Sequence, residues 1–216
     1  AIEFSDSKRV MLEKFVKGKE INLIGAVINY KLKILSISER LKPKNDNYFG
    51  IATLHLHPAK LSKKQIQLIQ SETLKLSKSL GLKFAILYPQ FIISNNTINL
   101  LEFALRIPGG YMSKIAINSS GVDLNEFLIK SYTYKNLKFS SLNKYKKYKA
   151  TCVNFITSLD HPKLINKRIE NIEYPNKDKN VEIKLNVKKN SLIPKLSNSS
   201  GRFGAVIVTD NNIDNA

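Results

Sequence analysis

The chain has 216 residues and a net charge of +18, and its 43% hydrophobic content is typical of a protein that folds around a core. It has no apolar run of the ~18 residues that a membrane-spanning helix needs, so we expect no membrane partner. The single cysteine, Cys152, excludes an internal disulfide bond and is typical of a reducing compartment, so we expect a cytoplasmic protein.

The first part of the chain has the pattern of an antiparallel meander. Residues 8–16 and 20–28 are predicted strands, joined by a tight turn at residues 17–19. Residues 29–31 form a second predicted turn, and residues 32–38 a third strand. The meander opens without a starting turn or cap, so we expect the chain to be a piece of a longer protein.

Residues 41–60 are polar and irregular, which predicts a long loop of the kind that is often functional. His55 and His57 lie two residues apart within it. Because no third ligand is in view, we interpret them as surface residues rather than as a metal site.

The following segment is predicted to be a helix. Ser62 and Gln65 have the spacing of a capping box, and Leu61 and Ile66 that of a hydrophobic staple. An apolar stripe continues at helical spacing until Gly81, a residue typical of helix ends.

Residues 83–93 and 98–106 are predicted to form a hairpin. Side chains alternate along the second segment, which places Glu102 and Arg106 on one largely apolar face. Each charge costs desolvation free energy there unless it has a partner. A bound cation could be the partner of Glu102, and a phosphate the partner of Arg106. Alternatively, the two side chains could form a purely structural ion pair with each other.

The register of the hairpin decides whether an amide joins the carboxylate. A three-residue loop at residues 95–97 pairs Gln90 with Glu102, whereas a two-residue loop at residues 95–96 pairs Gln90 with Leu101. We predict the three-residue loop, because it gathers the polar side chains of both strands on one face.

The sequence Pro108-Gly109-Gly110 follows the hairpin. Its glycines let backbone amides approach an anionic group closely. Two helices are predicted after it, over residues 111–118 and 123–131, with Gly121 between them.

Residues 131–149 interleave aromatic and basic side chains, which can bind single-stranded nucleic acid or form a linker with solvated lysines. Base readers prefer arginine, yet only five of the 35 basic residues of the chain are arginines. The lysine excess therefore favours a compositional bias and a linker, although its field would still attract an anionic substrate. The tract contains Tyr132, Tyr134, Lys135, Lys138, Phe139, Lys144, Tyr145, Lys146, Lys147, Tyr148 and Lys149, and the arginines are Arg9, Arg40, Arg106, Arg168 and Arg202.

The sequence pattern changes from Ala150 onwards to short apolar segments. Short strands are predicted at residues 152–157, 181–187 and 203–209, separated by turns rich in Asn, Lys and Pro. This pattern predicts a small β-rich domain at the end of the chain.

In this order, the elements resemble the C-terminal half of an ATP-grasp ligase of the carboxylate–amine or carboxylate–thiol type. The branch in question contains biotin carboxylase, carbamoyl phosphate synthetase and the formate-dependent glycinamide ribonucleotide transformylase. The likeness covers nearly the whole chain and includes Asp123 as a helix cap and residues 201–209 as the tail strand. It implies an α+β fold, with a C-terminal ATP-grasp subdomain (an antiparallel sheet with helices packed on it) over residues 1–148 and a small β-rich domain over residues 149–216.

The resemblance also assigns nucleotide-binding residues. Residues 10–20 look like the hinge of the family, whose backbone contacts adenine and whose later acid holds the ribose hydroxyls. By this likeness Glu13, Phe15 and Val16 bind the base and Glu20 binds the sugar.

In the family, two strands of a hairpin hold Mg²⁺ or Mn²⁺ against the phosphates of ATP. Gln90 and Glu102 match these ligands, and an amide oxygen can ligate Mg²⁺. Arg106 matches a basic residue that contacts phosphate and the acyl-phosphate intermediate. Ala104 departs from the pattern, because the family usually has Asn there.

The resemblance implies the nucleotide- and metal-binding half of an ATP-dependent ligase, acting on a small carboxylate and an amine. It places a substrate-binding domain and a glycine-rich lid before residue 1, so we expect weak or absent turnover by these residues alone. Two alternatives stay open: a basic nucleic-acid-binding module, which the lysine bias disfavours, and a ligase-derived domain that has lost catalysis. The sequence leaves a homodimer open.

Overall fold

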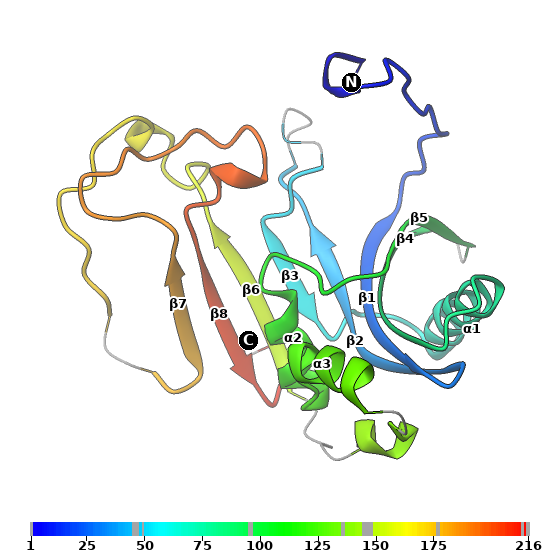
Figure 1. Cartoon of the computed structure of the whole chain (residues 1–216). Helices are drawn as coiled ribbons and strands as arrows, with labels where there is room; N and C mark the ends of the chain where they lie inside the picture. Colours follow the sequence, from blue (N-terminus) through cyan, green and yellow to red (C-terminus); the bar gives the residue numbers. More distant parts are fainter. Residues whose placement is uncertain are drawn as a thin grey trace.

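Eight strands form one antiparallel sheet in the order β5-β4-β1-β2-β3-β6-β8-β7 (Figure 1). This computed structural model describes residues 2–44, 48, 50–94, 97–134, 137–143, 149–175, 178–212 and 214. The strands are β1 (Lys19–Ile28), β2 (Lys31–Leu41), β3 (Leu54–His57), β4 (Phe84–Ser94), β5 (Thr97–Ala104), β6 (Ala150–Ile156), β7 (Val181–Leu185) and β8 (Gly204–Asp210).

Helices cover both faces of the sheet. Alternate residues of a strand point to opposite faces: Ile24 and Ala26 of β1 pack with α2 and α3, whereas Ile21 and Leu23 pack with Ile69 of α1. Helices α2 and α3 therefore lie on one face, where Figure 1 shows them in front of the sheet, and α1 lies on the other. The helices are α1 (Lys63–Ser79), α2 (Met112–Ser120) and α3 (Leu124–Thr133), with 3-10 turns at Ile2–Phe4, Phe139–Asn143, Pro162–Leu164 and Ser199–Gly201.

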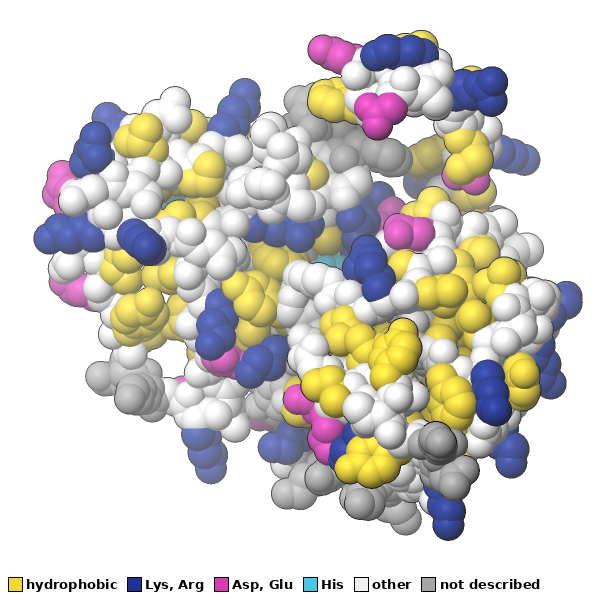
Figure 2. All heavy atoms as spheres, viewed as in Figure 1, with side chains coloured by type: hydrophobic (Ala, Val, Ile, Leu, Met, Phe, Trp, Pro, Cys, Tyr) yellow, Lys and Arg dark blue, Asp and Glu magenta, His cyan; other side chains and the backbone are white. Residues whose placement is uncertain are grey.

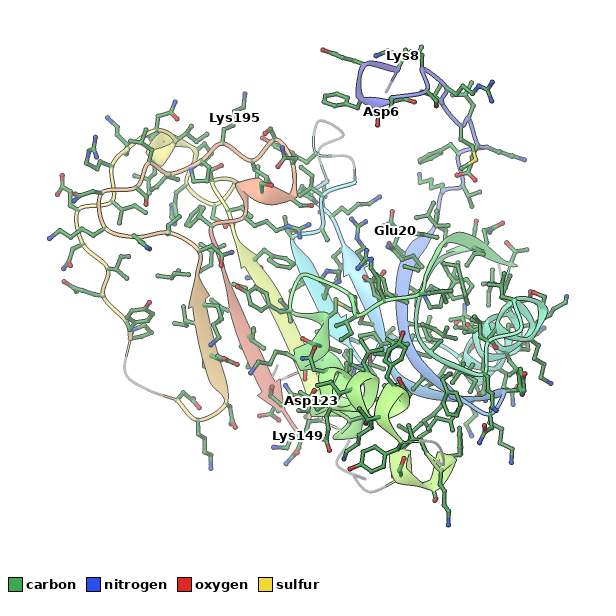
Figure 3. All side chains as sticks on the ribbon, viewed as in Figure 1. Asp6, Lys8, Glu20, Asp123, Lys149 and Lys195 are labelled. Atoms are coloured by element: carbon green, nitrogen blue, oxygen red, sulfur yellow. The ribbon has the colours of Figure 1, made fainter. Side chains whose placement is uncertain are left out.

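The predicted helices are confirmed, and so are the caps of two of them. Ser62 Oγ accepts from the Gln65 amide at 3.2 Å, and Gln65 Oε1 accepts from the Ser62 amide at 2.9 Å, which completes the capping box of α1. The Asp123 carboxylate, labelled in Figure 3, accepts from two amides in the first turn of α3 at 2.8 and 3.0 Å. None of the described helices is both long enough and apolar enough to span a membrane.

The predicted strand over residues 8–16 is wrong, so the meander has two strands at this point instead of three. Residues 9–17 have no regular structure and belong to an arm that leaves the body of the protein (Figure 1). Leu12 in this arm is 92% exposed. Strand β1 first pairs with β4 at Lys19, opposite Ile93. Within the described residues the arm has no neighbouring strand, and apolar alternation alone does not hold a strand in water.

The predicted loop over residues 41–60 contains strand β3. The expectation that His55 and His57 are surface residues is also wrong, because they are only 4% and 8% exposed. Strand β3 has four residues, too few for a periodic pattern to show, and it forms because β2 and β6 offer hydrogen-bonding partners on both of its sides.

The three strands predicted after residue 150 are confirmed as β6, β7 and β8. They continue the sheet of the earlier strands, because β6 pairs with β3. The division of the chain into domains at residues 148 and 149 stays a prediction. Lys135, Lys144, Tyr145, Lys146, Lys147 and Tyr148 of the aromatic and basic tract lie outside the described residues.

Candidate functional site

An amide and a carboxylate meet at one edge of the sheet. Gln90 of β4 lies directly opposite Glu102 of β5, and its Nε2 donates a hydrogen bond to Glu102 Oε2 at 3.0 Å. Glu102 is exposed and Gln90 is half-buried, so solvent reaches both side chains. We call these two residues the edge pair.

The predicted pairing of Gln90 with Glu102 is confirmed, but the predicted loop is wrong. Ser94 pairs with Thr97, so two residues lie between the paired ends and not three. A β-bulge then inserts Leu101 as an extra residue of β5, between the Phe91–Leu100 pair and the edge pair. The bulge shifts the register by one residue, which restores the pairing that the longer loop would have given.

The donor set of the edge pair fits a hydrated magnesium ion. Mg²⁺ takes oxygen ligands and commonly binds one or two protein groups together with waters and substrate phosphates. Glu102 offers a carboxylate, and a turn of the Gln90 amide would bring its Oε1 to the place of Nε2. No group of three or more His, Cys, Asp or Glu residues in the described parts of the chain could hold a metal ion. Waters and phosphate oxygens would therefore complete the coordination.

Arg106 lies in the loop that leads from β5 to α2. Its Nη1 donates to the Ile107 carbonyl at 3.3 Å, and the side chain is exposed. The loop turns at Gly110 and Tyr111, whose φ angles are +64° and +62°. Beyond the turn, the Tyr111 ring lies 6.3 Å from the ring of Phe155 in β6. The loop thus connects the sheet edge with its centre.

A second group of side chains lies at the centre of the same face. The Arg202 guanidinium stacks on the Phe155 ring, with Cζ 4.2 Å from the ring centroid, and the His55 ring meets Phe155 edge-on at 5.8 Å. Arg202 Nε is buried and has no hydrogen-bond partner among the described residues. We call His55, Phe155 and Arg202 the central cluster. Figure 2 shows basic side chains gathered around a hollow in this part of the surface.

The central cluster combines a neutral histidine with the positive charge of Arg202. Burial, followed by the charges of Arg40 and Arg202, lowers the pKa of His55 to about 3, so the imidazole is neutral at physiological pH. Asn22 Nδ2 donates to its Nδ1 at 3.2 Å. Burial and the charge of Arg40 also lower the pKa of Arg202. Two guanidiniums that oppose each other in this way favour an anionic ligand.

Tyr88 of β4 lies where the charges of the two groups meet. Burial raises the pKa of its phenol to about 12, and the charges of Arg40, Glu102, Arg106 and Arg202 also act on it. The charges of three of the five arginines of the chain therefore act on this one side chain.

Glu20, the predicted ribose ligand, lies at the start of β1 (Figure 3). Its side chain is 12% exposed, and its two carboxylate oxygens form ion pairs with Arg40 and Lys42. Arg40 also donates to the Gly50 carbonyl. The carboxylate is thus fixed in place by two cations, and its contact with ribose stays a prediction.

The predicted adenine contacts lie in a different part of the molecule. Glu13, Phe15 and Val16 belong to the N-terminal arm, where Glu13 is exposed, Phe15 is 71% exposed and Val16 is half-buried. The structure does not bring them together with the edge pair, and their role stays a prediction.

A pocket of ≈ 410 Å³ opens beside the central cluster, between Gly110, Phe155 and Arg202. Tyr111 closes part of its wall, because its hydroxyl donates to Asn186 Oδ1 at 3.3 Å. The hydroxyl-bearing residues Ser199 and Ser200 and the Arg202 guanidinium give the pocket polar and cationic walls.

No family model matches the sequence, and no curated protein matches it either. The structure, in contrast, is similar to solved ligases. One of them is a phosphoribosylglycinamide synthetase from Anaerococcus prevotii, with a TM-score of 0.79 and 20% sequence identity. The match covers 99% of this chain and 53% of the synthetase. The chain has an ATP-grasp fold. Sequence-based expectation and structure agree on this point and on the α+β class.

Two further structures with the ATP-grasp fold match at similar levels. An L-amino acid ligase from Bacillus licheniformis matches 93% of this chain and 51% of its own (TM-score 0.69, 17% identity). The match to a biotin carboxylase from Campylobacter jejuni, solved as a complex with β-γ-ATP, covers 92% of this chain and 43% of the carboxylase (TM-score 0.68, 16% identity). This chain thus spans about half the length of the solved structures that it matches.

Sequence reasoning missed Tyr88, Arg40, His55 and Arg202 as residues of this candidate site. One signal was available in the composition: arginine is rare among the basic residues, so each arginine deserves a structural reason. Only the fold brings three of them to one phenol, because they come from β2, the loop after β5 and the segment before β8.

Proposed function

We propose that this chain is the nucleotide- and metal-binding half of an ATP-dependent ligase that joins a carboxylate to an amine through an acyl phosphate. One observation carries the proposal: in an ATP-grasp fold, an amide and a carboxylate pair on adjacent strands, and the charges of Glu102 and three arginines act on Tyr88, two residues from Gln90 on the same strand. Oxygen ligands for a cation and positive charge for an anionic substrate thus both act on this part of the sheet.

The proposed reaction asks for positioning and charge neutralisation more than for proton transfer. A carboxylate oxygen attacks the terminal phosphorus of ATP, the bond from phosphorus to the bridging oxygen breaks, and ADP leaves. The amine then attacks the acyl carbon, phosphate leaves, and the amine loses a proton to solvent. Bound Mg²⁺ supplies charge neutralisation for the phosphates.

Each residue has a defined task in this proposal. Gln90 and Glu102 hold the metal ion, and Arg106 binds the phosphoryl group and then the acyl phosphate. Glu20 accepts hydrogen bonds from the ribose hydroxyls, held in position by Arg40 and Lys42. The pocket beside the central cluster admits the second substrate.

The chain covers only about half of each solved ligase that it matches, which supports a function shared with further polypeptide. Because the solved ligases are about twice as long, we expect a lid and a substrate-binding domain to come from polypeptide outside these residues. The 216 residues should then bind Mg·ATP without turning it over.

Titration calorimetry with Mg·ATP tests the proposal. The wild-type chain should bind Mg·ATP, and EDTA should abolish most of this binding. Glu102→Ala removes the only charged member of the edge pair. It should weaken binding at least about 10- to 100-fold, the loss known for groups that only support metal ligands.

Glu72→Ala is the matched control, because Glu72 lies on helix α1, and this helix packs on the opposite face of the sheet. It removes the same charge from this basic protein and should leave the affinity unchanged. Binding that is equal in MgCl₂ and EDTA, or equal losses in the two variants, would show that ATP is attracted by net charge alone and would refute the proposed metal site.

A further inference from the structure

Tyr88 and Ala104 face each other across the two strands that carry the edge pair. The register pairs Tyr88 of β4 with Ala104 of β5, two residues along each strand from Gln90 and Glu102. Because side chains alternate along a strand, all four residues share one face of the sheet. The Ala104 side chain ends at Cβ, so only Tyr88 offers a polar group at this step of the ladder.

The core fixes the ring of Tyr88. The residue is 7% exposed and belongs to the buried cluster that includes Ile86, Met112 and Phe155. A ring held in this way keeps its hydroxyl in one place. A group that stabilises charge developing during a reaction has to be preorganised in the same manner.

Charged groups from four parts of the chain act on this hydroxyl. They are Arg40 of β2, Glu102 of β5, Arg106 of the following loop and Arg202 before β8. The phenol offers an O–H donor at this place. An anion attracted by these guanidiniums would therefore meet a hydrogen-bond donor next to the edge pair.

We propose that Tyr88 is a catalytic residue, whose hydroxyl donates a hydrogen bond to an oxygen of the phosphoryl group while that group passes from ATP to the substrate carboxylate. The inference rests on the proposed function and adds a residue to it. The hydroxyl keeps its proton throughout: a carboxylate oxygen bonds to phosphorus, the bond from phosphorus to the bridging oxygen breaks, and ADP keeps the electron pair. The hydrogen bond stabilises negative charge on the transferred group.

The variant Tyr88→Phe tests this role, because it removes the hydroxyl and keeps the buried ring. The affinities for Mg·ATP and Mg·ADP are measured by calorimetry, since only ATP carries the phosphoryl group in question. Tyr88→Phe should weaken Mg·ATP about 10-fold, as expected for a hydrogen bond to a charged group, and should leave Mg·ADP unchanged.

Tyr132→Phe is the control, because Tyr132 is 85% exposed on α3. Thermal unfolding should show that both variants remain folded. An equal loss of Mg·ATP and Mg·ADP affinity in Tyr88→Phe, or no loss of either, overturns the inference.

The failures of the two proposals are distinguishable. When the wild type binds Mg·ATP in a metal-dependent way and Glu102→Ala abolishes this binding, an unchanged ratio of the Mg·ATP and Mg·ADP affinities in Tyr88→Phe removes only the role of Tyr88. When the wild type shows no metal-dependent binding, the proposed function falls and the role of Tyr88 falls with it.

Discussion

The edge pair and the central cluster lie on the same face of one sheet, but in opposite surroundings. Glu102 is open to solvent, whereas His55 and Phe155 are each only 4% exposed. An exposed carboxylate keeps its hydration until a cation replaces the water, while a buried imidazole must stay neutral and a buried guanidinium needs a ring to stack on. The face thus combines a solvent-exposed edge pair with a buried centre that carries positive charge.

The largest effect on stability should come from Phe155→Ala. The ring contacts His55, Tyr111 and Arg202, so its removal leaves a cavity and takes the stacking surface from a guanidinium. We expect the free energy of unfolding to fall by about 3–5 kcal/mol. Gln90→Ala at the edge should lower it by less than about 1 kcal/mol. Urea unfolding measures both values. Similar losses of unfolding free energy in the two variants would contradict the proposed difference between the edge pair and the central cluster.

A smaller effect should appear in the pH dependence of stability. The pKa of His55 is lowered in the folded protein from 6.5 to about 3, so between these values the unfolded chain binds a proton that the folded chain does not. The free energy of unfolding should therefore fall as the pH drops below 6.5, by up to about 1.4 kcal/mol per pH unit from this residue.

The variant His55→Gln should lose this part of the slope. Urea unfolding between about pH 7.5 and pH 4.5 compares it with the wild type and with His161→Gln, a change at an exposed histidine. The wild type and His161→Gln should have the same slope. If His55→Gln shared it too, burial of the His55 imidazole could not be its cause, and His57, whose pKa burial also lowers, would remain as a source.

The smallest effect should come from Gln90→Glu, and its sign should depend on magnesium. Two carboxylates opposite each other should lower the free energy of unfolding by about 0.5 kcal/mol in EDTA. In MgCl₂ the change should turn into a stabilisation, because two carboxylates hold a divalent cation better than one. Thermal unfolding in both buffers measures the change. Gln67→Glu on the exposed surface of α1 is the control and should show no dependence on Mg²⁺.

Features that depend on a few neighbouring residues were predictable from the sequence. The capping box of Ser62 and Gln65 and the Asp123 cap have their partners within three residues. The strands predicted over residues 20–28 and 32–38 exist as β1 and β2, joined by a short turn. Local spacing contains all the information that such features need.

The edge pair was predicted through two deviations that cancel. The loop is one residue shorter than expected, and the bulge at Leu101 adds one residue to β5. A bulge depends on how the two strands twist and pack, and the sequence gives no local signal for it. The amide and carboxylate therefore meet as expected, but for a different structural reason.

Partners far away in the sequence explain what could not be predicted. Residues 9–17 have the pattern of a strand and remain irregular without a neighbour, whereas Leu54–His57 lacks a pattern and becomes a buried strand between two neighbours. The burial of His55 follows from the same cause.

The sequence by itself determined the order of the elements, the helix starts and a hairpin able to carry an amide beside a carboxylate, because these depend on contacts between nearby residues. Only the tertiary structure decided which strand-like segments found a partner, and that Arg40, Arg106 and Arg202 act together on Tyr88. The physical reason is that β pairing and electrostatic interactions depend on distance in space, and the sheet order β5-β4-β1-β2-β3-β6-β8-β7 sets these distances for segments far apart in the chain.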